Sequence, residues 1–287
     1  MRSAKAYFPV LIRAQNPWGL DLWILRSNEH RPHLGGNKYY KLLGYVSLAR
    51  AENRQTLVTM AGAHSNHLRA FAELTHSEGF RSMAIIRGEE LVDESRHSAE
   101  IRHARQRGTE CVYVTRAAYR ALRDASAEER AEIVPAVDFR NSLFVPEGGL
   151  GEPGVLGVRA WASEAQGFDT VILPCATGTT AAGFLLATPA ATQIVGIAVL
   201  NNRAAVLQAV EGLAGAGACR FRLIADHAGP RFGPYRAPID PLVSDFIEHN
   251  RFPADAVYGM RMLAALAAHS ELRRQDQRIL LVQTYNE

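Results

Sequence analysis

The sequence predicts an α/β fold with mainly parallel sheets. Short apolar runs rich in β-branched residues alternate along the chain with longer segments whose apolar residues recur at the period of an α-helix. Most of the short runs are apolar almost throughout, as is typical of strands that are covered on both faces. A β-α-β-α order of this kind favours parallel sheets over an all-β or an all-α fold.

Each element is expected where one of these patterns occurs. The strands are predicted at residues 22–25, 56–60, 82–87, 111–114, 143–145, 170–174, 193–200 and 278–284. The helices are predicted at residues 38–51, 67–79, 94–107, 154–166, 179–187, 203–214, 242–250 and 255–268. A charged stretch, 116–132, precedes the glycine-dense residues 145–154, which suit a crossing between two domains.

Composition excludes several classes of protein. The 287 residues are 47% hydrophobic and 21% charged, as in an ordinary globular protein and unlike a disordered or fibrous one. The net charge of +3 comes with scattered acidic residues, so we expect no nucleic-acid binding. Cys111, Cys175 and Cys219 are widely spaced, which argues against a disulfide framework and a zinc site. No apolar run suits a signal peptide or a membrane span, so we expect a cytoplasmic protein.

Lysine is rare in this chain and two of its three copies lie close together. Of the 32 basic residues 29 are arginine, and lysine occurs only at Lys5, Lys38 and Lys41. Lys38 follows Gly35-Gly36-Asn37 at the start of a predicted helix, where amide dipoles favour an anion over a cation. Such a lysine is better placed beside an anion or a covalently bound aldehyde, and an uncharged lysine can form a Schiff base. The alternative is a solvated lysine after a Gly-Gly turn.

Two loops follow strands and carry small and polar residues. The first, residues 61–67 (AGAHSNH), places hydroxyl, amide and backbone N–H groups at a helix start, where α/β proteins bind carboxylates and phosphates. Alternatively, Ser65 or Asn66 only caps the helix. His64 and His67 lie three residues apart, but no third ligand accompanies them, so we expect no metal.

The second loop, within residues 174–183 (PCATGTTAAG), could cradle a phosphate with backbone amides and hydroxyls. It has neither the Gly-Lys-Ser/Thr of a P-loop nor the spacing of a dinucleotide fingerprint. An ordinary strand-to-helix turn is the alternative. Together with the lysine segment, the two loops indicate an anionic ligand more strongly than any of them does alone.

Four segments, in this order and at these spacings, resemble a known family. Residues 35–41, 63–67, 146–149 and 177–183 are similar to those of the pyridoxal 5′-phosphate (PLP) enzymes of the 1-aminocyclopropane-1-carboxylate deaminase and D-cysteine desulfhydrase group. The resemblance covers nearly the whole chain. It implies the tryptophan synthase β-like fold, with two parallel-sheet, three-layer αβα domains. A small domain of residues 43–145 would be inserted into a large domain of residues 1–42 and 146–287, with the cofactor between them, and a homodimer is implied.

The resemblance also implies how the cofactor is held. Lys38 would form the internal aldimine and then move a proton at Cα, and Lys41 would face the cofactor phosphate. Asn66 would contact the phenolic oxygen of the cofactor ring, and Thr284 would lie beside the ring. The phosphate would be held by four residues of the second loop, Thr177, Gly178, Thr179 and Thr180.

Four further residues would meet the substrate. The resemblance implies that Ser65 and His67 bind its carboxylate and that Ser65 relays a proton on the face opposite Lys38. Tyr235 and Tyr258 would line the substrate side, where a phenol can donate a proton or a hydrogen bond. Packing in the core is the alternative for either tyrosine.

The chain departs from the family near its last segments. The family usually has Tyr-Thr-Gly-Lys or Tyr-Glu-Gly-Lys, whose Thr or Glu meets the pyridine nitrogen, whereas this chain has Gly259 at that position. Tyr285 and Asn286 replace two glycines after the last strand, and Ala176 replaces a glycine at the start of the second loop. A weaker partner for the pyridine nitrogen disfavours a long-lived carbanion and is compatible with β-elimination or β-replacement.

The function expected from these residues is that of a PLP-dependent lyase or deaminase. Its substrate would be a small amino acid, with D-cysteine desulfhydrase-like and 1-aminocyclopropane-1-carboxylate deaminase-like activities as the two named possibilities. Lys38, Ser65 and Tyr258 would be the catalytic residues. A PLP-dependent synthase that performs β- or γ-replacement is one alternative, and a non-catalytic PLP-binding homologue is another. Fold alone does not choose between them.

Overall fold

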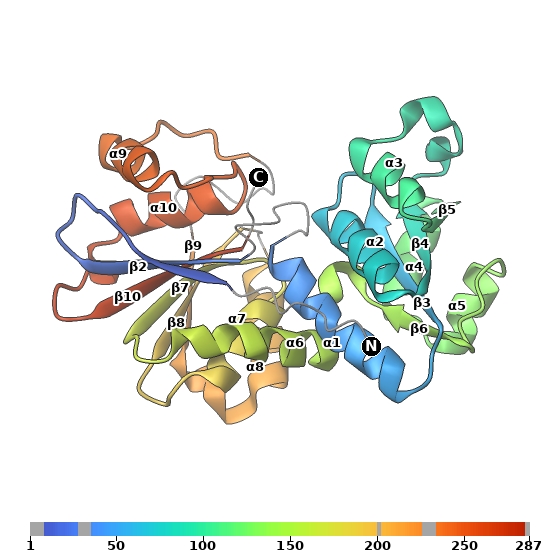
Figure 1. Cartoon of the computed structure of the whole chain (residues 1–287), viewed down its shortest axis with the longest axis horizontal. Coiled ribbons are helices and arrows are strands. Elements are labelled where there is room, and N and C mark those ends of the chain that lie inside the picture. Colours follow the sequence, from blue (N-terminus) through green and yellow to red (C-terminus); the bar gives the residue numbers. More distant parts are fainter. Residues whose placement is uncertain (1–8, 28–35, 200–201, 226–233, 285–287) are drawn as a thin grey trace. The chain divides into compact units, whose positions relative to one another are not determined.

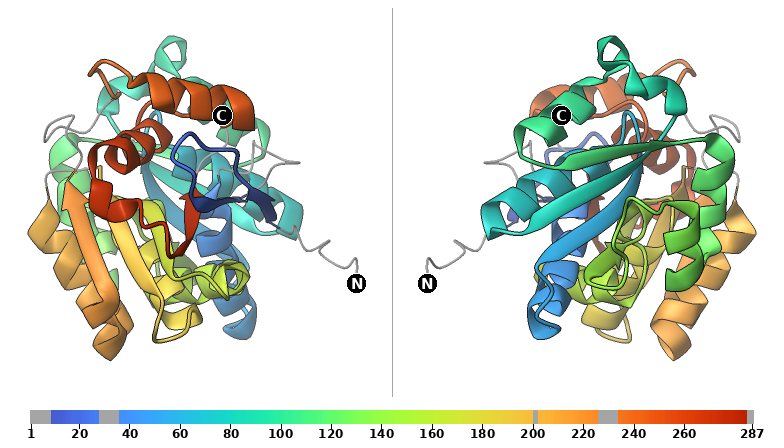
Figure 2. Two further views of the ribbon diagram at one scale, coloured as in Figure 1. Left: turned by 90° about the vertical axis from the view of Figure 1, so that its left-hand side faces the viewer. Right: turned by 90° about the vertical axis from the view of Figure 1, so that its right-hand side faces the viewer.

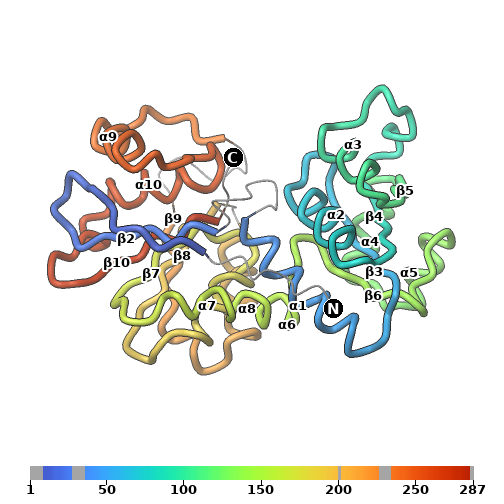
Figure 3. The backbone as a smooth tube through the Cα atoms, in the orientation of Figure 1, coloured from blue at the N-terminus to red at the C-terminus, as the bar shows by residue number. Residues whose placement is uncertain are grey.

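The computed structural model describes residues 9–27, 36–199, 202–225 and 234–284, which form two compact units. Residues 1–32 and 158–287 belong to the first, which we call the six-stranded unit after its sheet, and residues 33–157 belong to the second, the four-stranded unit. Figure 3 traces the chain through both. Helix α1 (Asn37–Ala51) runs through residue 43 without a break, so it lies wholly in the four-stranded unit. The domain limits of 43 and 145 stay a prediction.

The four-stranded unit is built on an entirely parallel sheet with the order β5-β4-β3-β6. Helices α2 and α3 cover one face of it, and α4 and α5 cover the other (Figure 2, right-hand view). The strands are β3 (Thr56–Gly62), β4 (Arg81–Arg87), β5 (Glu110–Val114) and β6 (Ser142–Val145). The helices and 3-10 turns after α1 are α2 (Asn66–Glu78), η2 (Glu89–Val92), η3 (Glu94–Arg96), α3 (Ala99–Gln106), α4 (Arg116–Asp124), α5 (Ala127–Ile133) and η4 (Glu147–Gly149).

Alternate residues of β3 enter the two cores of this unit, as the period of a strand requires. Val58 and Met60 pack in a cluster with Tyr119 of α4, whereas Ala61 packs in the cluster that contains Leu68 of α2. Thr59 is two residues before Ala61 and therefore shares the face that α2 covers. Thr59 is the one polar residue between Leu57 and Ala61.

The order of the strands places a topological switch point between β3 and β6. The chain passes from β3 to β4 and β5 on one side of β3 and returns to β6 on the other side. In open α/β sheets, ligands bind outside the carboxyl ends of the strands at such a point. The segments that follow these two strands are residues 63–65 and 146–149, both of which carry predicted motifs.

The six-stranded unit has the sheet order β1-β2-β10-β7-β8-β9, in which only the β1–β2 pair is antiparallel. Figure 1 shows α9 and α10 on one face of this sheet and α7 and α8 on the other. The strands are β1 (Val10–Arg13), β2 (Asp21–Arg26), β7 (Thr170–Cys175), β8 (Gln193–Ala198), β9 (Phe221–Ala225) and β10 (Arg278–Gln283). The helices are α7 (Thr179–Ala187), α8 (Arg203–Ala214), α9 (Pro241–Asn250) and α10 (Gly259–Ala268). Shorter turns are η5 (Ser163–Ala165), η6 (Gly215–Arg220) and η7 (Ser270–Leu272), and α6 (Glu152–Ala162) leads into this unit from residue 157.

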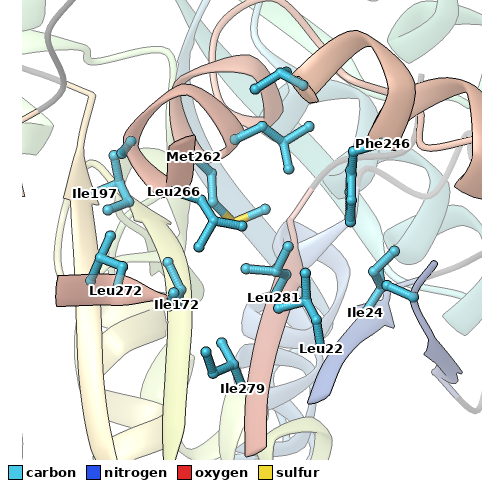
Figure 4. Packing of buried hydrophobic residues seen from close by; sticks show 14 of the residues in the cluster. Leu22, Ile24, Ile172, Ile197, Phe246, Met262, Leu266, Leu272, Ile279 and Leu281 are labelled. Atoms are coloured by element: carbon cyan, nitrogen blue, oxygen red, sulfur yellow. The ribbon is translucent and has the colours of Figure 1, made fainter. Parts of the chain in front are cut away.

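One large core lies between this sheet and the helices α9 and α10. Fully buried strand residues such as Leu22, Ile172 and Leu281 pack there with Phe246 and Leu266 (Figure 4). A second switch point lies between β7 and β10, because β8 and β9 continue on one side of β7 and the chain returns to β10 on the other. The residues that follow β7 are 176–178, and Thr284 follows β10.

The structure confirms the parallel α/β prediction and each predicted strand. It adds the edge strands β1 and β9, and it adds α4 and α5 in the charged stretch 116–132. The single helix predicted over 94–107 is wrong, because Ser98 caps a new helix by accepting from Ile101 N at 3.1 Å. The described residues include no helix with the length and apolarity that a membrane crossing needs.

Candidate active site

Lys38 is the second residue of α1, and no side chain caps this helix start. The preceding Gly36 has a φ of 57°, a left-handed conformation that glycine adopts without strain. Lys38 is half-buried. The loss of solvent around its ammonium lowers the pKa of that group to about 8, while the charge of Glu147 opposes this shift. An uncharged amine is therefore accessible near neutral pH, which a nucleophilic lysine requires. Gly35 lies outside the described residues.

Lys41 is buried along its whole length, with 2% of its surface exposed. Gly149 of the 146–149 motif lies against it and has a φ of 67°. A Cβ atom at position 149 would be 3.0 Å from the Cβ atom of Lys41. The motif therefore needs glycine both for its backbone conformation and for the close approach of this lysine.

Ser65 caps helix α2, as the alternative interpretation of its motif predicted. Its Oγ accepts a hydrogen bond from the backbone N–H of His67 at 3.2 Å. A hydroxyl that accepts one hydrogen bond can still donate its own proton, so capping does not consume the donor that a ligand would use. Asn66 is the first residue of α2 and is half-buried.

The imidazole of His67 is buried, with 1% of the residue exposed. Its Nε2 atom lies 2.8 Å from Oγ1 of Thr59, and that hydroxyl donates to the carbonyl oxygen of Val145 at 2.8 Å. Burial, together with the charges of Lys38 and Lys41, lowers the pKa of His67 to about 3, so the ring is neutral. Its Nδ1 atom is buried and has no hydrogen-bond partner among the described residues.

The protonation of this ring bears on its predicted role. The hydroxyl of Thr59 has one proton, which goes to Val145, so Nε2 must be the donor and Nδ1 carries a lone pair. A lone pair accepts hydrogen bonds and cannot donate one to a carboxylate. The predicted contact between His67 and a substrate carboxylate stays a prediction.

The start of helix α7 carries the glycine and threonine loop. Gly178 is its N-cap, with a φ of 82° and no side-chain cap, and a Cβ atom there would be 2.8 Å from Cγ2 of Val210. Thr179 is fully buried, and its Oγ1 has no hydrogen-bond partner among the described residues. Thr180 is also buried, whereas Thr177 is half-buried. An uncapped helix start beside an unsatisfied hydroxyl fits an anion.

Asp255 occupies the space that the missing side chain of residue 259 leaves. Its Oδ1 accepts from the backbone N–H groups of Val257 and Tyr258 at 3.0 and 2.7 Å, and its Oδ2 accepts from Gly259 at 2.8 Å. A Cβ atom on Gly259 would be 3.2 Å from Oδ2. The helix predicted from residue 255 therefore begins at 259, because the carboxylate replaces the first turn.

The two predicted tyrosines both lie in the six-stranded unit. Burial and the charge of Asp255 raise the pKa of Tyr258 to about 12, so its phenol keeps its proton at neutral pH and can donate it. Tyr235 is half-buried and lines a small cavity with Met260 and Val243. Its backbone N–H donates to the carbonyl oxygen of Ala256 at 2.6 Å, which ties it to the turn before α10.

Thr284 is buried and directly follows Gln283, the last residue of β10. The Nε2 atom of Gln283 donates to the carbonyl oxygen of Pro253 at 3.5 Å, so the end of β10 meets the segment that carries Asp255. Tyr285 and Asn286 lie outside the described residues.

The structure thus gathers the predicted residues into two sets, one in each unit. Lys38, Lys41 and His67 influence one another electrostatically in the four-stranded unit, where Ser65 and Asn66 start α2. In the six-stranded unit, residues 177–180 follow β7, Thr284 follows β10, Tyr258 precedes α10, and Tyr235 lies between β9 and α9. No group of three or more His, Cys, Asp or Glu residues suited to a metal ion occurs in the described part of the chain.

Sequence reasoning missed three residues of these sets. Thr59 could have been found as a lone polar residue within an apolar strand, and Asp255 as a helix-capping aspartate. Glu147 lies within a predicted motif, but its effect on Lys38 follows only from the folded chain.

Curated relatives of the chain have names that agree with the motifs. No family model matches the chain. The bifunctional D-cysteine desulfhydrase/1-aminocyclopropane-1-carboxylate deaminase, mitochondrial, of Arabidopsis thaliana is 24% identical over 197 residues, 63% of this chain and 49% of the relative. A putative 1-aminocyclopropane-1-carboxylate deaminase of Pyrococcus horikoshii is 28% identical over 190 residues, 64% of this chain and 53% of the relative. The chain therefore spans about half the length of these two relatives.

Solved structures of the same fold include several enzymes. An ACC deaminase homologue superposes with a TM-score of 0.75 at 20% identity, covering 98% of this chain and 90% of that one. An O-ureido-L-serine synthase superposes with a TM-score of 0.65 at 14% identity, covering 97% and 88%. The resemblance drawn from the motifs is confirmed: the chain is related in sequence to proteins named as 1-aminocyclopropane-1-carboxylate deaminases and D-cysteine desulfhydrases, and it has the two-sheet, tryptophan synthase β-like fold of the PLP enzymes.

Proposed function

We propose that this chain is a PLP-dependent lyase or deaminase that acts on a small amino acid. The observation that carries the proposal is Lys38, which lies at a helix start in a chain whose basic residues are nearly all arginine. Burial lowers the pKa of Lys38 to about 8. An arginine there would stay charged at every physiological pH, whereas this amine can lose its proton. The names of the curated relatives agree with this reaction class.

The residues present fit the phosphate of PLP. The hydroxyl of the buried Thr179, which has no partner among the residues that the structure describes, and the uncapped start of α7 offer hydrogen-bond donors to an anion. Thr177, Gly178 and Thr180 would complete this cradle, and the positive charge of Lys41 would attract the phosphate. Lys38 would hold the cofactor through its amine, Asn66 would donate to the phenolic oxygen of the ring, and Thr284 would pack beside it.

When bound, PLP supplies an electron sink for the substrate Cα. The chain supplies the proton transfers. The amine of Lys38 would take the proton at Cα, which its lowered pKa permits near neutral pH. Ser65 keeps a hydroxyl proton to donate to the substrate carboxylate or to relay. Tyr258 is protonated at neutral pH and would donate its proton on the substrate side, where Tyr235 would contribute packing.

A β- or γ-replacement synthase is the second candidate. The carboxylate of Asp255 beside Gly259 favours it, because this surrounding differs from that of the deaminase family. The substrate would be an amino acid in either case. We also propose a homodimer and a cytoplasmic location, although the Arabidopsis relative is named as mitochondrial.

The test is a spectral titration of the purified protein. Adding PLP should produce visible absorbance in the wild type and not in Lys38→Ala, whereas Arg50→Ala, which removes an exposed cation of the same helix, should behave as the wild type. A wild type that never acquires this absorbance would refute the proposal.

Product analysis separates the activities. Pyruvate from D-cysteine or 2-oxobutyrate from 1-aminocyclopropane-1-carboxylate would identify the lyase or the deaminase. A new amino acid formed with an added nucleophile would identify the synthase. Absorbance that no amino acid in a broad panel changes would indicate a protein that binds PLP without catalysis.

A further inference from the structure

A chain of buried hydrogen bonds links the two strands at the switch point of the four-stranded unit to the first turn of α2. Oγ1 of Thr59 donates to the carbonyl oxygen of Val145 at 2.8 Å and lies 2.8 Å from Nε2 of His67. Thr59 is fully buried, and His67 is 1% exposed. Water is thus kept away from these bonds, so each donor and acceptor must be satisfied within the protein.

This chain of bonds selects one tautomer of His67. The Nδ1–H tautomer would turn the lone pair of Nε2 toward a hydroxyl oxygen whose proton is already committed to Val145. Rotating the hydroxyl toward Nε2 would leave the Val145 carbonyl without this donor. Either change loses one buried hydrogen bond, so the neutral ring keeps its proton on Nε2 and presents a lone pair at Nδ1.

The lone pair, which has no partner in the described part of the chain, lies within the electrostatic reach of the lysines. The charge of Lys38 acts on His67 more strongly than the charge of Lys41, and Glu147 is the carboxylate that acts on Lys38. Helix α1 carries Lys38 and Lys41, helix α2 carries His67, and the two helices pack against each other. A buried acceptor without a partner is unfavourable, and an amine or ammonium is the kind of donor that would satisfy it.

We propose that His67 is a positioning residue whose Nδ1, which makes no hydrogen bond to the described residues in this structure, accepts one from the side-chain amine of Lys38 when that side chain turns toward it, with Thr59 and Val145 fixing the tautomer. This inference rests on the proposed role of Lys38. One N–H of a neutral amine bound to Nδ1 sets the rotation of the nitrogen about its last C–N bond. The nitrogen lone pair then has a defined direction, and the amine attacks an aldehyde or takes a proton along it.

Thr59 is the residue on which to test this, because its hydroxyl bonds to His67 and to the carbonyl oxygen of Val145. Thr59→Val keeps the shape and the strand preference of the side chain but removes the hydroxyl. Thr59→Ser keeps the hydroxyl and should rescue the effect. Thr75→Val is a matched control. Thr75 lies on α2, is buried as Thr59 is, and its hydroxyl donates to the Phe71 carbonyl oxygen at 2.8 Å.

The first readout is the rate at which visible absorbance develops after PLP is added. We expect it to fall about tenfold in Thr59→Val, the equivalent of one buried hydrogen bond, and to stay within about twofold of the wild type in Thr59→Ser and Thr75→Val. A Thr59→Val protein that folds and reacts at the wild-type rate would overturn the proposal.

The second readout needs no cofactor. The ¹⁵N NMR signals of His67 in the wild type at neutral pH should show a neutral ring with the proton on Nε2, and Thr59→Val should gain the Nδ1–H form. A charged ring or an Nδ1–H ring in the wild type would overturn the proposal even if Thr59→Val does not fold. A wild type that lacks PLP absorbance but shows the Nε2–H ring would refute the proposed function and leave the tautomer established.

Discussion

Replacing Lys38 by methionine should stabilise the fold at neutral pH. Folding holds the Lys38 ammonium in an environment that lowers its pKa from 10.5 to about 8. Such a change corresponds to about 3 kcal/mol of unfavourable free energy when the group is protonated in both the folded and the unfolded chain. Because the side chain is half-buried and some solvent reaches it, we expect Lys38→Met to raise the free energy of unfolding by about 2 to 3 kcal/mol.

The gain must depend on pH in one direction. Below pH 8 both states carry the proton on Lys38, so the folded wild type bears the whole unfavourable term. Between pH 8 and 10.5 the folded state loses the proton while the unfolded state keeps it, so wild-type stability rises with pH. Above 10.5 both states are neutral and the advantage of Lys38→Met disappears. At pH 9.5 roughly half of the gain at pH 7 should remain.

The assay is urea denaturation without PLP, because a ligand that binds the folded state would stabilise it separately. Arg50→Met is the control, since Arg50 is an exposed cation of the same helix that pairs with Glu78 and lies 5.9 Å from the ring centre of Phe80. It should change the unfolding free energy by about 1 kcal/mol or less at both pH values. A Lys38→Met protein no more stable than the wild type, or a gain that is constant with pH, would refute the reasoning.

Three further changes test other parts of the two sets. Gly178→Ala should cost about 2 to 3 kcal/mol in urea denaturation, because its φ is 82° and its Cβ would meet a side chain at 2.8 Å; Gly79→Ala, with a φ of 77° and open space, should cost only about 1. Glu147→Gln should lower the pH at which PLP absorbance develops, since its charge raises the pKa of Lys38; an unchanged or higher midpoint contradicts this. Asp255→Ala should cost about 1 to 2 kcal/mol as the cap of α10 is lost, more than Asp255→Asn, and equal losses would argue against capping.

Apolar runs predicted the strands well because burial on both faces leaves a direct mark on composition. The elements that were missed carry a weaker mark. Strand β9 (Phe221–Ala225) lies at a sheet edge, and Leu223 is its one buried residue. Helices α4 and α5 are dominated by charged residues, and in α4 only Tyr119 and Leu122 are fully buried. Thr115 caps the start of α4, and a capping box of Ser126 and Glu129 begins α5.

The candidate site was predictable in its residue types but not in its proton positions. Motif spacing indicates that Lys38 and His67 matter, and it says nothing about which ring nitrogen carries the proton. That follows from the bond between Thr59 and Val145, residues on two strands that are 86 positions apart. Likewise, Gly259 reads as a lost side chain, whereas the folded chain places the carboxylate of Asp255 in that space.

In a chain that uses arginine almost everywhere, physical reasons explain why two positions are lysine. Lys38 must be able to lose its proton near neutral pH, which a guanidinium cannot do because it stays charged at every physiological pH. Lys41 is 2% exposed and its stem lies against the backbone of Gly149, where a compact ammonium fits and a broad, planar fork would need more room. Burial keeps the ring of His67 neutral, and both lysines add to this effect because two nearby positive charges oppose a third. We therefore expect that replacing either lysine by an uncharged residue raises the pKa of the His67 imidazole.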